Sequence, residues 1–369
     1  MFISSAEILN LWGKEKITIP FYEDVTLLTG ANGSGKSSLL NILFDSLNGT
    51  AKNRKPSTSK NRFWSSKVSF TNNVNMTTLL MPVSFDDKEF DSVTKTILES
   101  ADDTHDFDFL CSLQDHFTLH SNDFSQNYVS YTKNEQGERW LKTVDIPTDL
   151  DTDEFNENLT KAPLAFLFQE DRQSMHNLAN SSIEFTGNYW KLYKSSIDER
   201  FSYCRDFMQV LESHLDKLVA KELRSSGNNF ANLVLSEEYN YASQRSQEIE
   251  SIVEILNSYF EDSNKYLVRD EQNKYTLASS SSGEPIHWGL LSRGEKTIIY
   301  LLFSTYYYRD KVKVFLLDEP EISLHVRWQK RLINDLRNIA PKSQFIIATH
   351  SPSLVKDGWR SRCIEVGVR

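Results

Sequence analysis

The spacing of apolar residues changes within the first fifty positions of the chain. Apolar and polar residues alternate through 1–20, and a short apolar stretch occupies 24–30, which is typical of β-strands. Residues 35–49 instead carry leucine and isoleucine at helical intervals. The pattern therefore predicts strands at the N-terminus, the last of which runs through a glycine-rich turn into a helix.

A similar succession returns in the C-terminal half. Helical spacing occupies 188–224, 236–261, 293–308 and 325–340. Compact apolar stretches, typical of buried strands, occupy 162–169, 311–317, 343–350 and 363–368, and residues 265–279 have the pattern of a hairpin. Buried strands that alternate with helices predict an α/β fold.

The middle of the chain has a different pattern. Residues 67–85 and 127–143 have the pattern of strands with polar turns. Residues 51–67 hold six basic residues and no acidic one. This basic segment has two interpretations. It is either a solvated surface loop, which its composition favours, or a nucleic-acid contact in which basic side chains meet phosphates while Phe63 and Trp64 stack on bases.

Composition narrows the class of protein. The chain has 369 residues and a net charge of −10, with acidic tracts at 86–109 and 145–157. This balance argues against a surface that coats nucleic acid throughout. The three cysteines are far apart and form no metal-ligand spacing. No segment has the pattern of a signal peptide or a transmembrane helix, so we expect a cytoplasmic chain with no membrane partner.

The glycine-rich turn carries the first chemical motif. Residues 30–37, GANGSGKS, match G-x-x-x-x-G-K-[ST] between a predicted strand and a predicted helix. Glycine lets the backbone point its N–H groups at phosphate oxygens, and the helix adds its positive end. We expect the phosphates of a nucleoside triphosphate to contact Asn32, Gly33, Ser34, Gly35, Lys36, Ser37 and Ser38, and Ser37 also to ligate Mg²⁺. The alternative is a chance glycine-rich turn.

The second motif lies at 314–325, VFLLDEPEISLH. Four apolar residues lead to Asp318 and Glu319, which places two carboxylates at the end of a buried strand, the ligand edge of an α/β sheet. We expect Asp318 to hold Mg²⁺ and Glu319 to be the general base toward the attacking water. The alternative, incidental acids at a solvent-facing strand end, fits poorly with so apolar a strand.

The third motif, LSRGEK at 291–296, resembles the signature motif of ABC-type ATPases, in the form typical of the SMC-, RecF- and OLD-like branch. The motifs together extend the resemblance over 1–49 and 162–369. It implies an ABC-type P-loop ATPase head in which two chains enclose two ATP molecules. Ser292 and Gly294 of one chain would then face the γ-phosphate held by the other. Taken alone, this motif also fits an N-capped helix without a ligand.

The resemblance implies roles for further residues. His350, at the end of the apolar stretch 343–350, corresponds to the family's histidine near the γ-phosphate, so the resemblance implies a catalytic set of Glu319, His350 and Lys36. Gln169 resembles the glutamine that contacts Mg²⁺ and couples the core to the helical lobe. A simple polar strand end, or a role for Arg172 instead, remains the alternative. His325 is expected at the dimer interface.

The same resemblance suggests a domain organisation. We expect the ATPase core, with a mixed β-sheet, in 1–49, 162–187 and 262–369, and a β-rich insertion with the basic and acidic segments in 50–161. A helical lobe in 188–261 is too short for a long coiled coil. The chain ends soon after His350, so we expect no appended nuclease domain; a separate protein would cut any nucleic acid.

Compact heads of this branch resemble the ATPase subunits of prokaryotic anti-phage defence systems of the Septu and PARIS types. The resemblance implies a Mg²⁺-dependent ATP hydrolase that senses or scaffolds. Its partners would be a second copy, a higher homo-oligomer, and a separate nuclease or toxin effector. The alternative is a RecF-like DNA-repair ATPase that clamps DNA directly, which makes nucleic acid a further candidate partner. A transporter ATPase is disfavoured because the signature lacks the LSGGQ form.

Overall fold

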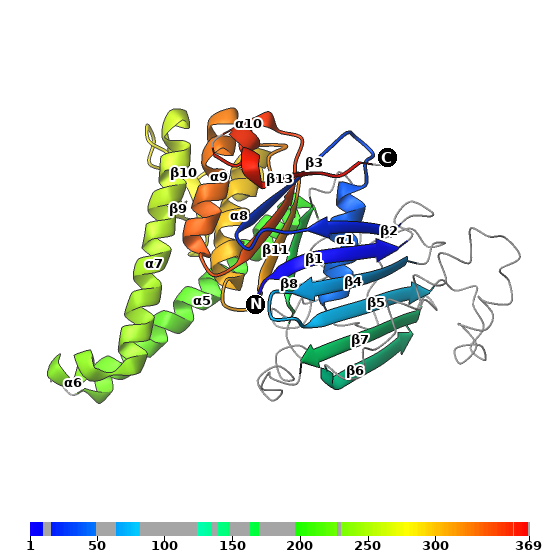
Figure 1. The fold of residues 1–369 in the computed structure, drawn as a ribbon. Coiled ribbons are helices and arrows are strands. Elements are labelled where there is room, and N and C mark those ends of the chain that lie inside the picture. The colour runs from blue at the N-terminus through cyan, green and yellow to red at the C-terminus, as the bar shows by residue number, and fades with distance from the viewer. Residues whose placement is uncertain are drawn as a thin grey trace, which may run out of the picture. The chain divides into compact units, whose positions relative to one another are not determined.

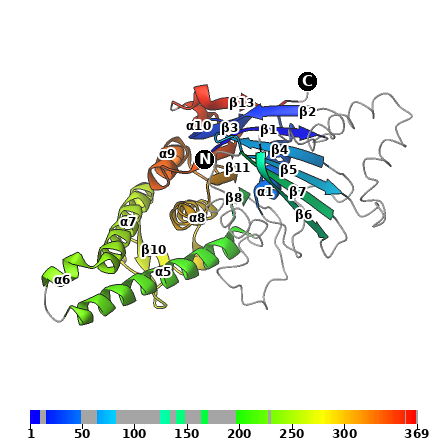
Figure 2. The same cartoon turned by 60° about the horizontal axis from the view of Figure 1, so that its bottom comes forward.

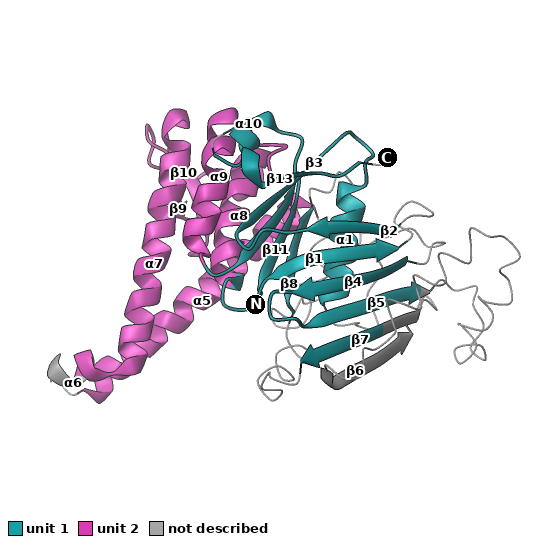
Figure 3. Ribbon diagram, in the orientation of Figure 1, with its two compact units in different colours: residues 1–169, 308–319, 342–369 teal, residues 170–307, 320–341 magenta. Residues whose placement is uncertain are grey.

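The computed structural model describes residues 1–9, 16–48, 64–81, 124–133, 139–147, 163–169, 196–226, 230–356 and 358–367. The chain divides into two compact units (Figure 3). Unit 1 comprises residues 1–169, 308–319 and 342–369, and unit 2 comprises residues 170–307 and 320–341. Each unit is therefore assembled from segments that are far apart in the sequence.

Unit 1 contains a five-stranded parallel sheet. Its strands, in spatial order, are β13 (Cys363–Glu365), β3 (Val25–Thr29), β12 (Gln344–Ala348), β11 (Val314–Asp318) and β8 (Ala165–Gln169). Strands β11 and β12 are buried along their whole length, which explains their continuous apolar sequences. Because every pair is parallel, the carboxyl ends of all five strands lie along one edge of the sheet.

A six-stranded antiparallel sheet forms the second layer of unit 1 (Figure 1). Its strands, in spatial order, are β2 (Lys16–Pro20), β1 (Ile3–Leu9), β4 (Trp64–Phe70), β5 (Asn75–Met81), β7 (Arg139–Pro147) and β6 (Phe124–Lys133). The N-terminal strands thus share one sheet with strands from the segment expected to be an insertion. The two sheets together give the mixed strand pairing expected from the sequence. The division into core, insertion and lobe stays a prediction.

Helix α1 (Lys36–Leu47) packs against both sheets, on β8, β11 and β12 on one side and on β4 and β5 on the other. This double contact explains why its residues from Leu39 to Leu47 are all buried. Among the polar residues, Ser46 has hydrogen-bond partners for its buried hydroxyl, which donates to the carbonyl of Ile42 at 2.7 Å. The Ser46 hydroxyl also lies 2.5 Å from the hydroxyl of Ser66 on β4.

Unit 2 is mainly helical. Helices α5 (Ile197–Ser225) and α7 (Glu237–Phe260) run side by side, with α6 (Phe230–Leu235) at their far end (Figure 2). The other elements are the hairpin of β9 (Lys265–Arg269) and β10 (Tyr275–Ser279), α8 (Arg293–Tyr308), whose last residue belongs to unit 1, and α9 (Val326–Ile339). The short α10 (Pro352–Lys356) belongs to unit 1. No helix in the described part of the chain is long and apolar enough to cross a membrane.

The expected elements of the C-terminal half are confirmed, including the β9–β10 hairpin, α8, α9 and the strands that flank α9. The basic segment needs one correction. Trp64 was expected in an exposed loop, but it begins β4 opposite Leu80 and is only 2% exposed, so it cannot stack on a nucleic-acid base. Phe63 and the basic residues from Lys52 to Arg62 lie outside the described residues.

Candidate active site

The glycine-rich turn between β3 and α1 has a backbone that side chains would disturb. Gly30 has φ +139, and a Cβ there would lie 2.3 Å from the carbonyl oxygen of Val366. Gly35, with φ 89, is the N-cap of α1 and has no side chain to occupy the helix end. No acidic residue stands in the first turn of α1. The first N–H groups of α1 therefore suit an anion.

Lys36 lies along this turn. Its Nζ lies 3.1 Å from the carbonyl oxygen of Gly30, 3.0 Å from that of Ala31 and 3.3 Å from the hydroxyl of Ser34. Burial lowers the pKa of Lys36, and the charges of Glu319 and Asp318 partly offset that effect. The ammonium group is therefore held at the glycine-rich turn with two carboxylates nearby.

Asp318, the last residue of β11, accepts hydrogen bonds from one side chain of α1 and one of β8. The Ser37 hydroxyl donates to its Oδ1 at 3.0 Å, and the Gln169 amide donates to its Oδ2 at 3.1 Å. Gln169 reaches it because β8 and β11 are parallel and in register, with Gln169 opposite Asp318. Burial raises the pKa of Asp318, and the hydrogen bonds from Ser37 and Gln169 act in the opposite direction. Hydroxyl and carboxylate oxygens are the ligand types that Mg²⁺ prefers, so Ser37 and Asp318 fit that ion.

Glu319 has an uncommon backbone conformation. Its φ is +48, which costs energy for a residue with a side chain, and its N–H donates to the carbonyl of Ala348 at 2.8 Å. Its Oε1 lies 3.6 Å from Nε2 of His350, which follows β12. Both side chains are about one third exposed, at 29% and 35%. A carboxylate that can accept a proton and an imidazole thus lie together, next in sequence to Asp318.

The remaining predicted residues are divided between the two units. Asn32 and Gly33 are exposed in the turn, and Ser38 lies in the first turn of α1. Ser292 and Gly294 belong to unit 2, at the start of α8. The backbone of Ser323 packs closely against Gly294, since a Cβ at Gly294 would lie 2.4 Å from the carbonyl oxygen of Ser323. In the same unit, His325 is the N-cap of α9 and accepts from the N–H of Arg327.

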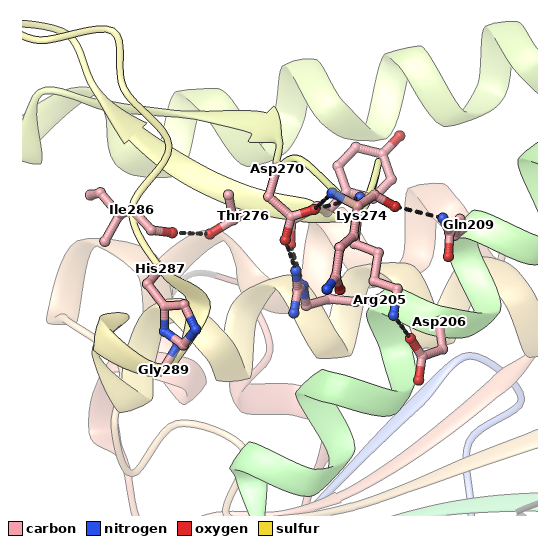
Figure 4. A network of polar contacts seen from close by, with 11 residues as sticks. Arg205, Asp206, Gln209, Asp270, Lys274, Thr276, Ile286, His287 and Gly289 are labelled. Carbon is pink, nitrogen blue, oxygen red and sulfur yellow. Dashed lines mark hydrogen bonds and ion pairs between the residues drawn. The ribbon is translucent and has the colours of Figure 1, made fainter.

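A network of ionic and hydrogen bonds ties the β9–β10 hairpin to α5 (Figure 4). The guanidinium of Arg205 contacts the carboxylate of Asp270 and also donates to the carbonyl of Tyr275 at 2.7 Å. Lys274 pairs with Asp206 at 2.6 Å. Within β10, the Thr276 hydroxyl donates to the carbonyl of Ile286 at 2.6 Å, and the segment that contains Ile286 leads to α8.

Sequence reasoning missed Asn48, which directly follows α1. Its side chain accepts from the N–H of Ala165 at 3.0 Å and donates to the carbonyl of the same residue at 3.1 Å. The ammonium of Lys142 on β7 donates to the Asn48 carbonyl. Asn48 thus joins the end of the phosphate-binding helix to the start of β8. The only sequence signal, a polar residue at a helix end, is too common to predict this contact.

Comparison with known proteins identifies relatives. The model of the AAA_21 family, described as "AAA domain, putative AbiEii toxin, Type IV TA system", matches residues 25–356. The Septu protein PtuA of Bacillus thuringiensis is 35% identical over 105 residues, which cover 25% of this chain and 26% of PtuA. The retron Vc95 probable ATPase of Vibrio cholerae is 21% identical over 370 residues, covering 89% of this chain and 66% of that protein.

A third relative is the endonuclease GajA of Bacillus cereus, 30% identical over 30% of this chain and 18% of its own length. The matched regions thus span less than two thirds of the length of each of these three relatives. Among solved structures, an SMC head bound to the C-terminal winged-helix domain of ScpA aligns over 100% of this chain and 95% of its own, with a TM-score of 0.46 and 15% identity.

Proposed function

This chain belongs to the AAA_21 family of ATPase domains, and on that premise we propose that it hydrolyses ATP with Mg²⁺ as a dimer that encloses two nucleotides. The observation that carries the proposal is the convergence of Ser37, Gln169 and Asp318, from three separate segments, beside the turn that holds Lys36. Such a convergence of hydroxyl, amide, carboxylate and ammonium groups fits a nucleoside triphosphate.

Under this proposal, each residue of the site has its own role in ATP hydrolysis. The turn and Lys36 would bind the phosphates, and Ser37 with Asp318 would hold Mg²⁺, which when bound neutralises charge on phosphate oxygens. Glu319 would accept a proton from the attacking water, and His350 would sense the γ-phosphate. Ser292 and Gly294 would act on the nucleotide held by the second copy. Catalysis would rest on positioning and electrostatics.

We further propose that this ATPase is the sensor or scaffold subunit of an anti-phage defence complex with a separate nuclease or toxin effector. The local similarity to the Septu protein PtuA and the longer similarity to a retron ATPase support this role. The complex would assemble within a higher homo-oligomer. The effector would be recognised as a second protein that co-purifies in fixed ratio.

The experiment compares the wild-type chain with Glu319→Gln. Glu319→Gln should bind ATP, hydrolyse it at less than about one hundredth of the wild-type rate, and accumulate as the dimer, because it lacks the base. Phosphate release, with and without EDTA, and mass photometry measure these properties. Wild-type turnover by Glu319→Gln would refute the assignment of the base.

A pull-down from the native host tests the biological role. A stoichiometric second protein with a nuclease or toxin fold would support the defence complex. An ATP-dependent dimer that retains DNA and no second protein would instead favour direct clamping of DNA. Wild-type chain that releases no phosphate from ATP under any condition would refute the proposed activity.

A further inference from the structure

The start of α8 has a reciprocal pair of hydrogen bonds. The N–H of Ser292 donates to Oε2 of Glu295 at 2.7 Å, and the N–H of Glu295 donates to the Ser292 hydroxyl at 3.3 Å. This is a capping box, which satisfies two N–H groups that a helix start otherwise leaves unpaired. Because the Ser292 hydroxyl accepts in this pair, its own hydrogen can still be donated to a phosphate oxygen.

The capping carboxylate presents an electrostatic problem for that role. Glu295 is only 4% exposed and stands in the first turn of α8, where the helix end would otherwise attract an anion. The other phosphate-binding helix, α1, has no acidic residue in its first turn. A buried negative charge close to Ser292 would repel an approaching phosphate unless a cation offsets it.

Lys265, the first residue of β9, supplies that cation. Its Nζ donates to Oε1 of Glu295 at 2.7 Å, while Oε2 is held by Ser292. Each carboxylate oxygen thus has its own donor, which fixes the orientation of the group as well as its charge. The neighbouring Lys296 is directed elsewhere, since its Nζ lies 2.5 Å from Asp198 and 3.2 Å from the carbonyl of Gly289.

The hairpin that carries Lys265 is itself anchored. Arg205 of α5 contacts Asp270 in the turn of the hairpin, and Lys274 of the hairpin pairs with Asp206 of α5 (hairpin and α5 in Figure 4). The guanidinium of Arg269 also pairs with Glu212 of α5, with its NH1 nitrogen at 2.8 Å from Oε2. The N–H of Leu267 donates to the side chain of Asn257 at 2.7 Å. Lys265 therefore approaches Glu295 from an element held along its length, which favours a fixed position for its ammonium group.

We propose that Lys265 is a positioning residue for ATP-dependent dimerisation, which neutralises Glu295 and holds Ser292 oriented toward the γ-phosphate bound by a second copy. The inference rests on the proposed function. It predicts a defect in the step that uses Ser292 in trans, with nucleotide binding by the single chain left intact.

The test uses Lys265→Met, which keeps most of the side-chain volume and removes the charge. In the Glu319→Gln background, mass photometry over a range of protein concentrations measures the ATP-dependent dimer. We expect dimerisation to weaken on the order of tenfold, the size of effect that a partly buried charge at a helix end can have. Binding of a fluorescent ATP analogue at concentrations where the chain is monomeric should not change. Lys274→Met, which removes a lysine of the same hairpin that pairs with Asp206, is the matched control and should dimerise normally.

Two further variants separate charge from packing. Glutamine also serves at the third position of a capping box, so Lys265→Met with Glu295→Gln should restore dimerisation because no buried charge remains unpaired. Glu295→Gln alone should dimerise at least as tightly as the parent. Lys265→Arg should retain most of the parent's dimerisation.

The outcomes are distinguishable. Normal dimerisation by Lys265→Met, no rescue by the double variant, or weaker dimerisation by Glu295→Gln alone would each overturn the role of Lys265. The last of these outcomes remains decisive even where Lys265→Met does not fold. If the parent Glu319→Gln chain shows no ATP-dependent dimer, the proposed function itself fails, and the inference fails with it.

Discussion

The contact of Asn48 with β8 leads to the sharpest prediction about stability. Asn48→Ala removes the two hydrogen bonds, at 3.0 and 3.1 Å, that join a fully buried side chain to the backbone of Ala165. Losing buried hydrogen bonds to backbone groups costs about 1 to 2 kcal/mol for each bond. We therefore expect the free energy of unfolding to fall by roughly 2 to 4 kcal/mol.

Thermal unfolding of the purified chain measures this loss. A change of that size should lower the Tm by roughly 4 to 16 °C in a chain with units of this size. Asn240→Ala is the matched control, because the Asn240 side chain is exposed and makes one hydrogen bond, to the carbonyl of Val234. The control should change the free energy of unfolding by less than about 0.5 kcal/mol.

The same variant separates stability from nucleotide binding. Saturating ATP should raise the Tm of Asn48→Ala about as much as it raises the Tm of the wild-type chain. Ligand stabilisation depends on affinity, and Asn48 makes no described contact with the turn at Gly30 or with Lys36. If Asn48→Ala had the same Tm as the Asn240→Ala control, the reasoning about these buried hydrogen bonds would be refuted.

Two other changes at the site have defined outcomes. Gly30→Ala places a Cβ 2.3 Å from the carbonyl oxygen of Val366, at a residue with φ +139, so it should displace the turn. We expect ATP binding to weaken at least about tenfold, as measured by titration with a fluorescent ATP analogue. Unchanged affinity would contradict this prediction. Asp318→Asn should abolish Mg²⁺-dependent hydrolysis and yet raise the Tm of the nucleotide-free chain at pH 7. Burial raises the folded-state pKa of Asp318, so its ionised form opposes folding above the unfolded-state pKa, and the gain should shrink as pH falls toward that value. If Asp318→Asn had a lower Tm than the wild-type chain at pH 7, the predicted direction of this stability change would be wrong.

The sequence predicts the site well where chemistry is carried by local patterns. A strand, a glycine-rich turn and a helix specify the backbone around Lys36 without any distant residue. Asp318 and His350 end two buried strands, so the parallel arrangement of those strands brings both to one edge. Gln169 follows the same rule at the end of a third strand, although its separation in sequence from Lys36 is large.

The sequence predicts less where the partner of a residue lies in a distant segment. The burial of Trp64 depends on β4 pairing with β1 and β5, and a tryptophan among basic residues has no local sign of that pairing. The contact of Lys265 with Glu295 is equally hard to predict, because a lysine at a strand start is common. Such contacts follow from the tertiary arrangement, and periodicity reports only which face of an element is apolar.

The charges around the two helix ends predict that ATP binding and ATP-dependent assembly are separable in this chain. The start of α1, in unit 1, has no nearby acid in its own first turn, and Lys36 lies beside it. The start of α8, in unit 2, carries the buried carboxylate of Glu295, which pairs with Lys265 on β9. Under the proposed function, a single chain would hold a nucleotide with unit 1 residues alone. By the inference above, the contribution of Ser292 to a second copy depends on the ion pair of Lys265 with Glu295, which one substitution removes. Affinity for ATP and ATP-dependent assembly should therefore respond to different residues.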